Sequence, residues 1–160
     1  MKPNSSPVTH RISLESIFKY MMETGYYPEF EQTHIQFDLD GNIAVVDSEE
    51  GFVSLRLFFS IEQEEYDLFM EASNLTMLRT FAVKANVMED MENIVFSCEV
   101  MCDNIRDLQR FFPRAIECMR DTVNAHKTEM RRLVRLRKSQ QTTIPASDDI
   151  EAGITKKIFS

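Results

Sequence analysis

The side chains best suited to chemistry are three histidines and three cysteines, and they are scattered along the chain. None of His10, His34 and His126 has a neighbouring Cys or Ser in a nucleophile setting. His126 recurs with apolar residues at helical spacing, which favours a packed imidazole over a catalytic base. We therefore predict no catalytic residue, and a protein that is not an enzyme.

The cysteines predict neither a disulfide framework nor a metal site. Cys98, Cys102 and Cys118 are odd in number and include no Cys-x-x-Cys pair. This pattern is typical of buried thiols in a reducing cytoplasm. No apolar run approaches the length needed to span a bilayer, and the polar N-terminus lacks the apolar region of a secretory signal. We expect a cytoplasmic protein without a membrane partner.

Other ligand patterns also fail on spacing. Asp38, Asp40 and Asn42 surround Gly41, but a calcium loop requires its Gly sixth and a bidentate Glu twelfth. A hairpin turn explains these residues better. The glycines are too dispersed to form a phosphate-binding loop. The sequence predicts no metal and no cofactor.

Charge is distributed unevenly along the chain. Residues 29–71 contain twelve acidic residues and one basic residue, whereas residues 127–138 contain six basic and one acidic. Cations are favoured at a helix C-terminus, and Glu62, Glu64 and Glu65 are candidate partners for them. The basic stretch is therefore interpreted first as a charge-balanced helix end. Two other interpretations are contact with a protein or other acidic partner, and binding to nucleic acid. Nucleic acid is the less favoured partner, because the body is acidic and no aromatics interleave with the cations.

The hydrophobic period predicts the elements that position these residues. Ser13 is expected to cap a helix that stops near Gly25, and alternating residues over 35–59 predict three short-turned antiparallel strands. Ser60 with Gln63 reads as a capping box for a second helix that ends near Asn74. Two further strands follow, the first with Phe81, Val83, Ala85 and Val87 on one face and the second with Ile94, Phe96, Cys98 and Val100.

The last element is a long helix. Asp103 is its expected cap, and its apolar residues recur with a period near 3.5, typical of a seam against another helix or a flat face. Pro113 predicts a break or kink near Phe111-Phe112. The fold class is α+β, with a five-stranded antiparallel sheet in the order helix-β-β-β-helix-β-β-long helix. We expect a polar leader over 1–12, one domain over 13–138 and a flexible polar tail over 139–160.

The two faces of this sheet differ in character. One face is predicted to form the core, with Phe37, Val45, Val53, Leu55, Leu57, Val83, Phe96 and Cys98. The other mixes polar residues with Phe52, Phe58, Met88, Val95 and Met101. Contiguous exposed apolar groups mark interfaces, so either a helix or the tail covers this face, or a dimer or client contact does. The candidate partner-binding residues are these five together with Met130, Leu133, Arg131 and Arg135.

Several segments resemble the YbjN-type proteins and the wider type III secretion chaperone-like fold, over roughly residues 12–136. The resemblance rests on ISLESIFKYMMETGYYPEF, IQFDLDGNIAVVD, SLRLFFSI and FFPRAIE, with Asn74 and Lys84. It implies a small, acidic, homodimeric cytoplasmic protein that binds other proteins and hydrolyses nothing. Secretion chaperones of this fold hold an extended client segment, but the long basic helix end departs from their pattern. The expected function is capture of a partner's segment on the sheet face or beside the last helix, and the alternative is regulatory nucleic-acid binding through that basic end.

Overall fold

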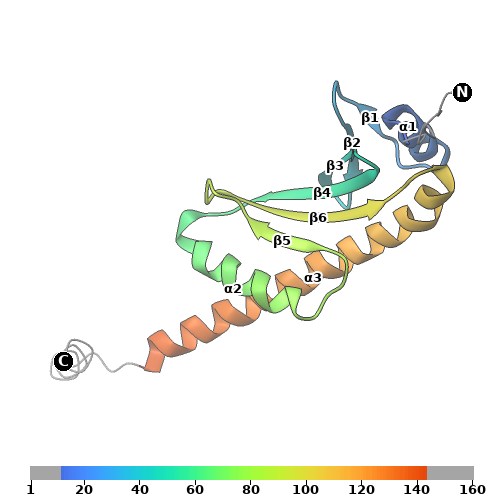
Figure 1. The fold of residues 1–160 in the computed structure, drawn as a ribbon. Helices are drawn as coiled ribbons and strands as arrows, with labels where there is room; N and C mark the ends of the chain where they lie inside the picture. The colour runs from blue at the N-terminus through green and yellow to red at the C-terminus, as the bar shows by residue number, and fades with distance from the viewer. Residues whose placement is uncertain (1–11, 144–160) are drawn as a thin grey trace, which may run out of the picture.

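The structure, a computed structural model, describes residues 12–143, in which three α-helices pack against one face of an antiparallel sheet (Figure 1). The strands lie in the order β1-β2-β3-β4-β6-β5. The elements are α1 (Leu14–Glu23), β1 (Glu29–Phe30), β2 (Ile35–Leu39), β3 (Asn42–Glu49), β4 (Phe52–Ser60), the 3₁₀ turn η1 (Gln63–Glu65), α2 (Tyr66–Met77), β5 (Lys84–Val87), β6 (Asn93–Met101) and α3 (Ile105–Thr143).

The α+β class is confirmed, but the sheet has six strands where the sequence predicted five. The additional strand is β1, whose Glu29 and Phe30 pair with Gln36 and Ile35 of β2. A two-residue edge strand is too short to display a period of two, so the hydrophobic pattern gave no sign of it.

Two tight hairpins set the register of the first half of the sheet. Asp40-Gly41 joins β2 to β3 and Glu50-Gly51 joins β3 to β4, and all four residues have positive φ between 50° and 84°. Such mirror-image turns match the twist of the strands that they connect. The predicted hairpin at Gly41 is confirmed, and its Asp40 carboxylate accepts hydrogen bonds from Arg120 Nε at 2.7 Å and Nη2 at 3.0 Å. The turn is thereby tied to α3.

The helices lie where the sequence predicted them, but some of their first and last residues differ from the prediction. Ser13 caps α1 as predicted, through a hydrogen bond from the Ser16 amide at 3.2 Å. Ser60 is instead the last residue of β4, so it caps nothing, and α2 continues past Asn74 to Met77. The strand that begins at Lys84 leaves Phe81 outside the sheet and exposed.

The last helix is longer and less interrupted than predicted. Asn104, not Asp103, accepts the first-turn hydrogen bond, from the Asp107 amide at 3.0 Å. The helix runs unbroken through Pro113, although proline removes one backbone donor there. It also continues past Lys138 to Thr143, so residues 139–143, expected in a flexible tail, are helical. The rest of that expected tail, residues 144–160, lies outside the described part. At the other end, Ile12 is buried and its carbonyl accepts a hydrogen bond from Ser48, so it belongs to the domain.

The core lies between α3 and the inner face of the sheet, with α1 closing one end (Figure 1). Phe112 of α3 is almost fully buried, and its ring centroid lies 5.9 Å from Tyr20, 5.3 Å from Tyr26 and 6.2 Å from Phe37. This aromatic cluster joins α1, the following loop, β2 and α3. The two tyrosine contacts of Phe112 are edge-to-face, and such packing adds stabilisation beyond the burial of area.

We predict that Phe112→Ala lowers the free energy of unfolding by about 3–5 kcal/mol, because the cavity borders three other rings. Urea denaturation measures this loss. The matched control is Phe81→Ala, whose side chain is exposed and whose removal changes stability by about 0.5 kcal/mol or less. Equal effects of the two variants would show that the cluster contributes little.

Candidate functional site

The outer face of the sheet carries two apolar cross-strand pairs. Phe52 of β4 lies opposite Met101 of β6, and Phe58 lies opposite Val95. Phe52, Phe58 and Met101 are 45%, 42% and 69% exposed, whereas Val95 is half-buried. Within residues 12–143 all three helices pack on the opposite face, so none of them covers these side chains (Figure 1).

The sequence assigned most strand residues to the correct face. Phe37, Val53, Leu55, Leu57, Val83, Phe96 and Cys98 are buried as predicted. Val45 was assigned wrongly: it pairs with Arg56 and Gln36 on the outer face, and its neighbours Ala44 and Val46 are the buried residues. Met88 is exposed in the loop between β5 and β6.

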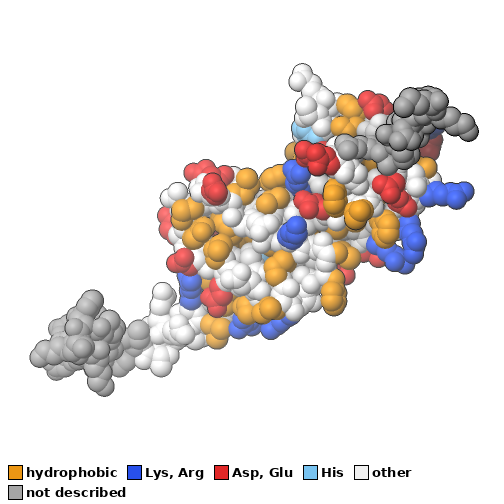
Figure 2. Space-filling model, in the orientation of Figure 1, with side chains coloured by type: hydrophobic (Ala, Val, Ile, Leu, Met, Phe, Trp, Pro, Cys, Tyr) orange, Lys and Arg blue, Asp and Glu red, His pale blue; other side chains and the backbone are white. Residues whose placement is uncertain are grey.

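A polar band separates the two apolar pairs. The Arg56 guanidinium lies 3.5 Å from the Asp47 carboxylate, and Lys84 Nζ lies 3.5 Å from Glu99. Ser54 donates a hydrogen bond to Asp47 at 3.1 Å, and its small side chain lines a shallow hollow of about 210 Å³. Apolar and charged side chains also alternate across the side of the molecule shown in Figure 2. The outer face therefore offers apolar contacts at two places and charge in between.

The C-terminal half of α3 packs against α2. Leu133 is buried in a small cluster with Leu68 and Ala72, and Met130 and Val134 pack at its margin. The sequence predicted Leu133 to be a partner-binding residue. It is instead a core residue of this chain, and its side chain is not available to a partner. The hydrophobic period identified a seam but could not show that α2 occupies it.

One acidic residue of the basic stretch is fully engaged. Glu129 is 4% exposed, pairs with Arg79 just after α2, and accepts a hydrogen bond from Arg132 Nε at 2.8 Å. The hydrogen bond from Arg132 holds the pKa of Glu129 below its usual value. Glu62, Glu64 and Glu65, the partners expected from sequence, form no ion pair with these cations. Arg131 and Arg135 are exposed and unpaired among the described residues.

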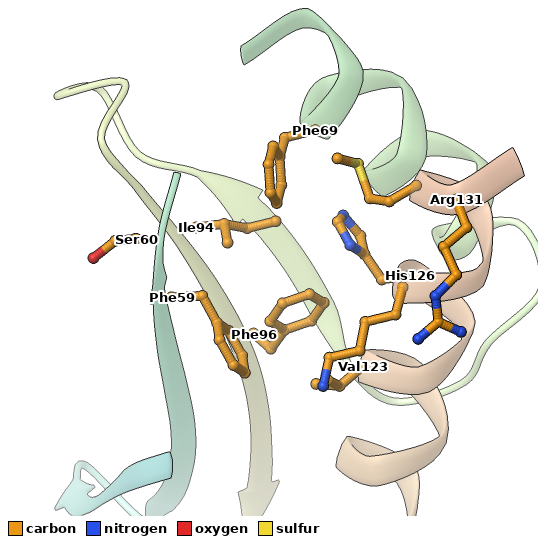
Figure 3. Close-up of a pocket in the computed structure, with 10 residues that line it drawn as sticks. Phe59, Ser60, Phe69, Ile94, Phe96, Val123, His126 and Arg131 are labelled. Atoms are coloured by element: carbon orange, nitrogen blue, oxygen red, sulfur yellow. The ribbon is translucent and has the colours of Figure 1, made fainter. Parts of the chain in front are cut away.

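A pocket of about 340 Å³ lies on the helix side of the sheet, where the ends of β4 and β6 meet α2 and α3 (Figure 3). Phe59 and Phe96 form one wall, Phe69 closes it from α2, and His126 faces them from α3. Lys127 and Arg131 also line it. This site could not be recognised in the sequence because four separate segments build it, although Lys127 and Arg131 recur at i, i+4.

His126 is a buried side chain that forms part of the pocket wall. Its position among the apolar residues of α3 predicted such packing. It is 3% exposed, its Nε2 lies 3.2 Å from Ser73 Oγ, and its ring centroid lies 5.2 Å from Phe96 and 5.7 Å from Phe69. Burial lowers the pKa of His126 below 6.5, and a hydrogen bond to the Phe69 backbone offsets part of that effect. The imidazole is therefore neutral at pH 7.

The cysteines lie in the core or at its edge and are free thiols. Burial raises the pKa of Cys102 to about 11 and also raises that of Cys98. These thiols are protonated at neutral pH and are poor nucleophiles. Within residues 12–143 no three His, Cys, Asp or Glu side chains gather to hold a metal ion. No helix in this range combines the length and apolar character required to cross a bilayer.

The neutral His126 predicts a specific loss of stability on acidification. Because its pKa is lower in the folded chain than in the unfolded chain, the unfolded chain binds the proton more readily as the pH falls below 6.5. We expect the free energy of unfolding to fall from pH 7 to pH 5, by at most about 1.4 kcal/mol per pH unit from this group. Urea denaturation at several pH values measures the slope.

His126→Gln should reduce the pH dependence of the free energy of unfolding. His34→Gln is the control: His34 lies just before β2 and outside the core, so this variant should keep the pH dependence of wild type. If wild type and His126→Gln show parallel slopes, the imidazole does not control stability in this range.

Comparison with known proteins shows similarity of structure without similarity of sequence. No protein-family model and no curated protein matches the chain. Among solved structures, YbjN from E. coli, a candidate transcription regulator, aligns with a TM-score of 0.62 at 11% identity, over 72% of this chain and 94% of YbjN. An uncharacterised protein from Methanothermobacter thermautotrophicus aligns with a TM-score of 0.51 at 14% identity, over 79% of this chain and 99% of that protein. The resemblance noted in the sequence is thus confirmed at the level of the fold, and this chain has a YbjN-type fold.

Proposed function

We propose that this protein is a non-enzymatic binding module that holds an extended segment of a partner protein against the outer face of its sheet. The observation that carries the proposal is the exposure of Phe52, Phe58 and Met101 in two apolar cross-strand pairs. These pairs lie on a face that no helix of residues 12–143 covers. Exposed apolar patches rimmed by polar residues are typical of protein interaction sites.

The spacing of the two contacts suits an extended ligand. Phe52 and Phe58 are six residues apart on one strand, which corresponds to about 20 Å. A partner segment of similar length could place one apolar side chain at each contact. The polar band between them, with Asp47 and Glu99 beside Arg56 and Lys84, would then align charged or polar groups of the partner.

The proposed absence of catalysis is supported by the state of the reactive groups. His126 is buried and hydrogen-bonded to Ser73, whose side chain is also buried. His126 lines the pocket, but its Nε2 is already engaged by the Ser73 hydroxyl. The raised pKa values of Cys98 and Cys102 argue against a thiolate nucleophile at neutral pH.

We predict that Phe58→Glu and Met101→Glu each weaken partner capture by roughly tenfold or more, because a carboxylate must be desolvated at an apolar contact. Tagged wild-type protein is used to isolate a partner from its own cell lysate after nuclease treatment. The purified partner is then titrated against each variant. Both substitutions lie at exposed positions, so the melting temperature should remain close to that of wild type.

The matched control is Leu78→Glu, which adds the same charge at an exposed apolar residue just after α2. It should leave partner affinity unchanged. If Phe58→Glu and Met101→Glu bind the partner as wild type does, the outer face is not the site. Light scattering of the same proteins tests the expected homodimer, and a dimer that Phe58→Glu converts to monomer would mean that this face joins two copies of the chain.

Regulatory nucleic-acid binding is the second candidate, favoured by the exposed Arg131 and Arg135, which form no ion pair within residues 12–143. If this candidate is correct, duplex DNA binding should weaken steeply as salt rises, and replacing Arg131, Arg132 and Arg135 by Ala should abolish it. Fluorescence anisotropy between 50 and about 200 mM salt measures both effects. Affinity that does not change with salt would exclude this candidate.

A further inference from the structure

We propose that the pocket between β4, β6, α2 and α3 binds a small amphiphilic carboxylate, with its aliphatic chain among the aromatic side chains and its carboxylate at Lys127 and Arg131. This site lies on the helix side of the sheet, opposite the face proposed for the partner protein. The two proposals therefore rest on different residues and can fail separately.

The walls of the pocket suit an apolar chain. Phe59, Phe69, Phe96, Ile94 and Val123 line it, and its volume of about 340 Å³ lies within the range of small-molecule sites. In Figure 3 the three phenylalanine rings and His126 surround a common space. The neutral imidazole is already hydrogen-bonded to Ser73, so it contributes a wall and not a charge.

Lys127 and Arg131 give the pocket a positively charged end. Lys127 and Arg131 are one helical turn apart on α3, are both exposed, and form no ion pair within residues 12–143. Two other arginines of the same helix are occupied, since Arg120 binds Asp40 at both carboxylate oxygens and Arg132 binds Glu129. Asp40, whose carboxylate is influenced by the charge of Lys127, is already engaged by Arg120.

The combination disfavours uncharged and cationic ligands. An uncharged apolar ligand would leave both cations without a partner, and an ammonium amphiphile would be repelled by them. A carboxylate accepts charge-assisted hydrogen bonds from both Lys and Arg, and each such bond contributes more than a neutral one. An amphiphile with a single carboxylate matches the apolar walls and the cationic mouth together.

The test is isothermal titration calorimetry of the full chain with decanoate, below its micelle concentration, and with decanol as the uncharged probe of equal length. We expect saturable one-to-one binding of decanoate, and affinity for decanol that is lower by at least about tenfold. Lys127→Ala and Arg131→Ala should each weaken decanoate by roughly tenfold to a hundredfold and leave decanol unchanged. The double variant should bind the two probes equally.

Arg135→Ala is the matched control, because it removes the same charge from the same helix outside the pocket. It should bind decanoate as wild type does. The proposal is overturned if decanoate shows no saturable binding, if decanol binds as tightly, or if Arg135→Ala weakens decanoate as much as Arg131→Ala. Tighter binding of N-acetylphenylalanine than of decanoate would also overturn it, since a protein C-terminus would then be the better occupant.

Discussion

The pairing of β4 with β6 determines which residues of this sheet are buried. The two nine-residue strands pair along their whole length, from Phe52 with Met101 to Ser60 with Asn93. Side chains alternate between faces, so a shift of one residue would exchange the core set for the exposed set. If β4 slipped against a fixed β6, Leu55 would face solvent and Phe58 would turn toward α3. The core and the outer face are consequences of one register.

The same sheet separates two regions of different chemistry. On one side, Phe59, Ile94 and Phe96 face α2 and α3 and form part of the pocket wall. On the other, their neighbours Phe58 and Val95 face outward. Adjacent residues of a single strand therefore belong to different sites. A substitution at one of them changes the other site only if it disturbs the strand itself.

Much of this arrangement could be predicted from the sequence, because the signals were local. Alternation over 35–59 and 94–100 identified the main strands and, except at Val45, their inward-facing residues. Ser13 indicated a helix cap and Gly41 a turn. What could not be predicted depended on contacts between distant segments. The engagement of Leu133 by Leu68, the pairing of Glu129 with Arg79, and the pocket each join α2 to α3 across about fifty residues or more of chain. A seam with period 3.5 showed that α3 must pack, but not against what.

The unbroken course of α3 also restricts how its length can change in evolution. Phe112 belongs to the aromatic cluster at one end of the domain, and His126 and Leu133 pack against α2 at the other. One inserted or deleted residue between Phe112 and His126 would rotate the far half of the helix by about 100°, because a turn holds 3.6 residues. The near and far contacts could not then be kept together. Beyond Val134 no cluster contact imposes this phase in the described residues, which end at Thr143. Length variation among relatives should therefore accumulate there and not between the two packed ends.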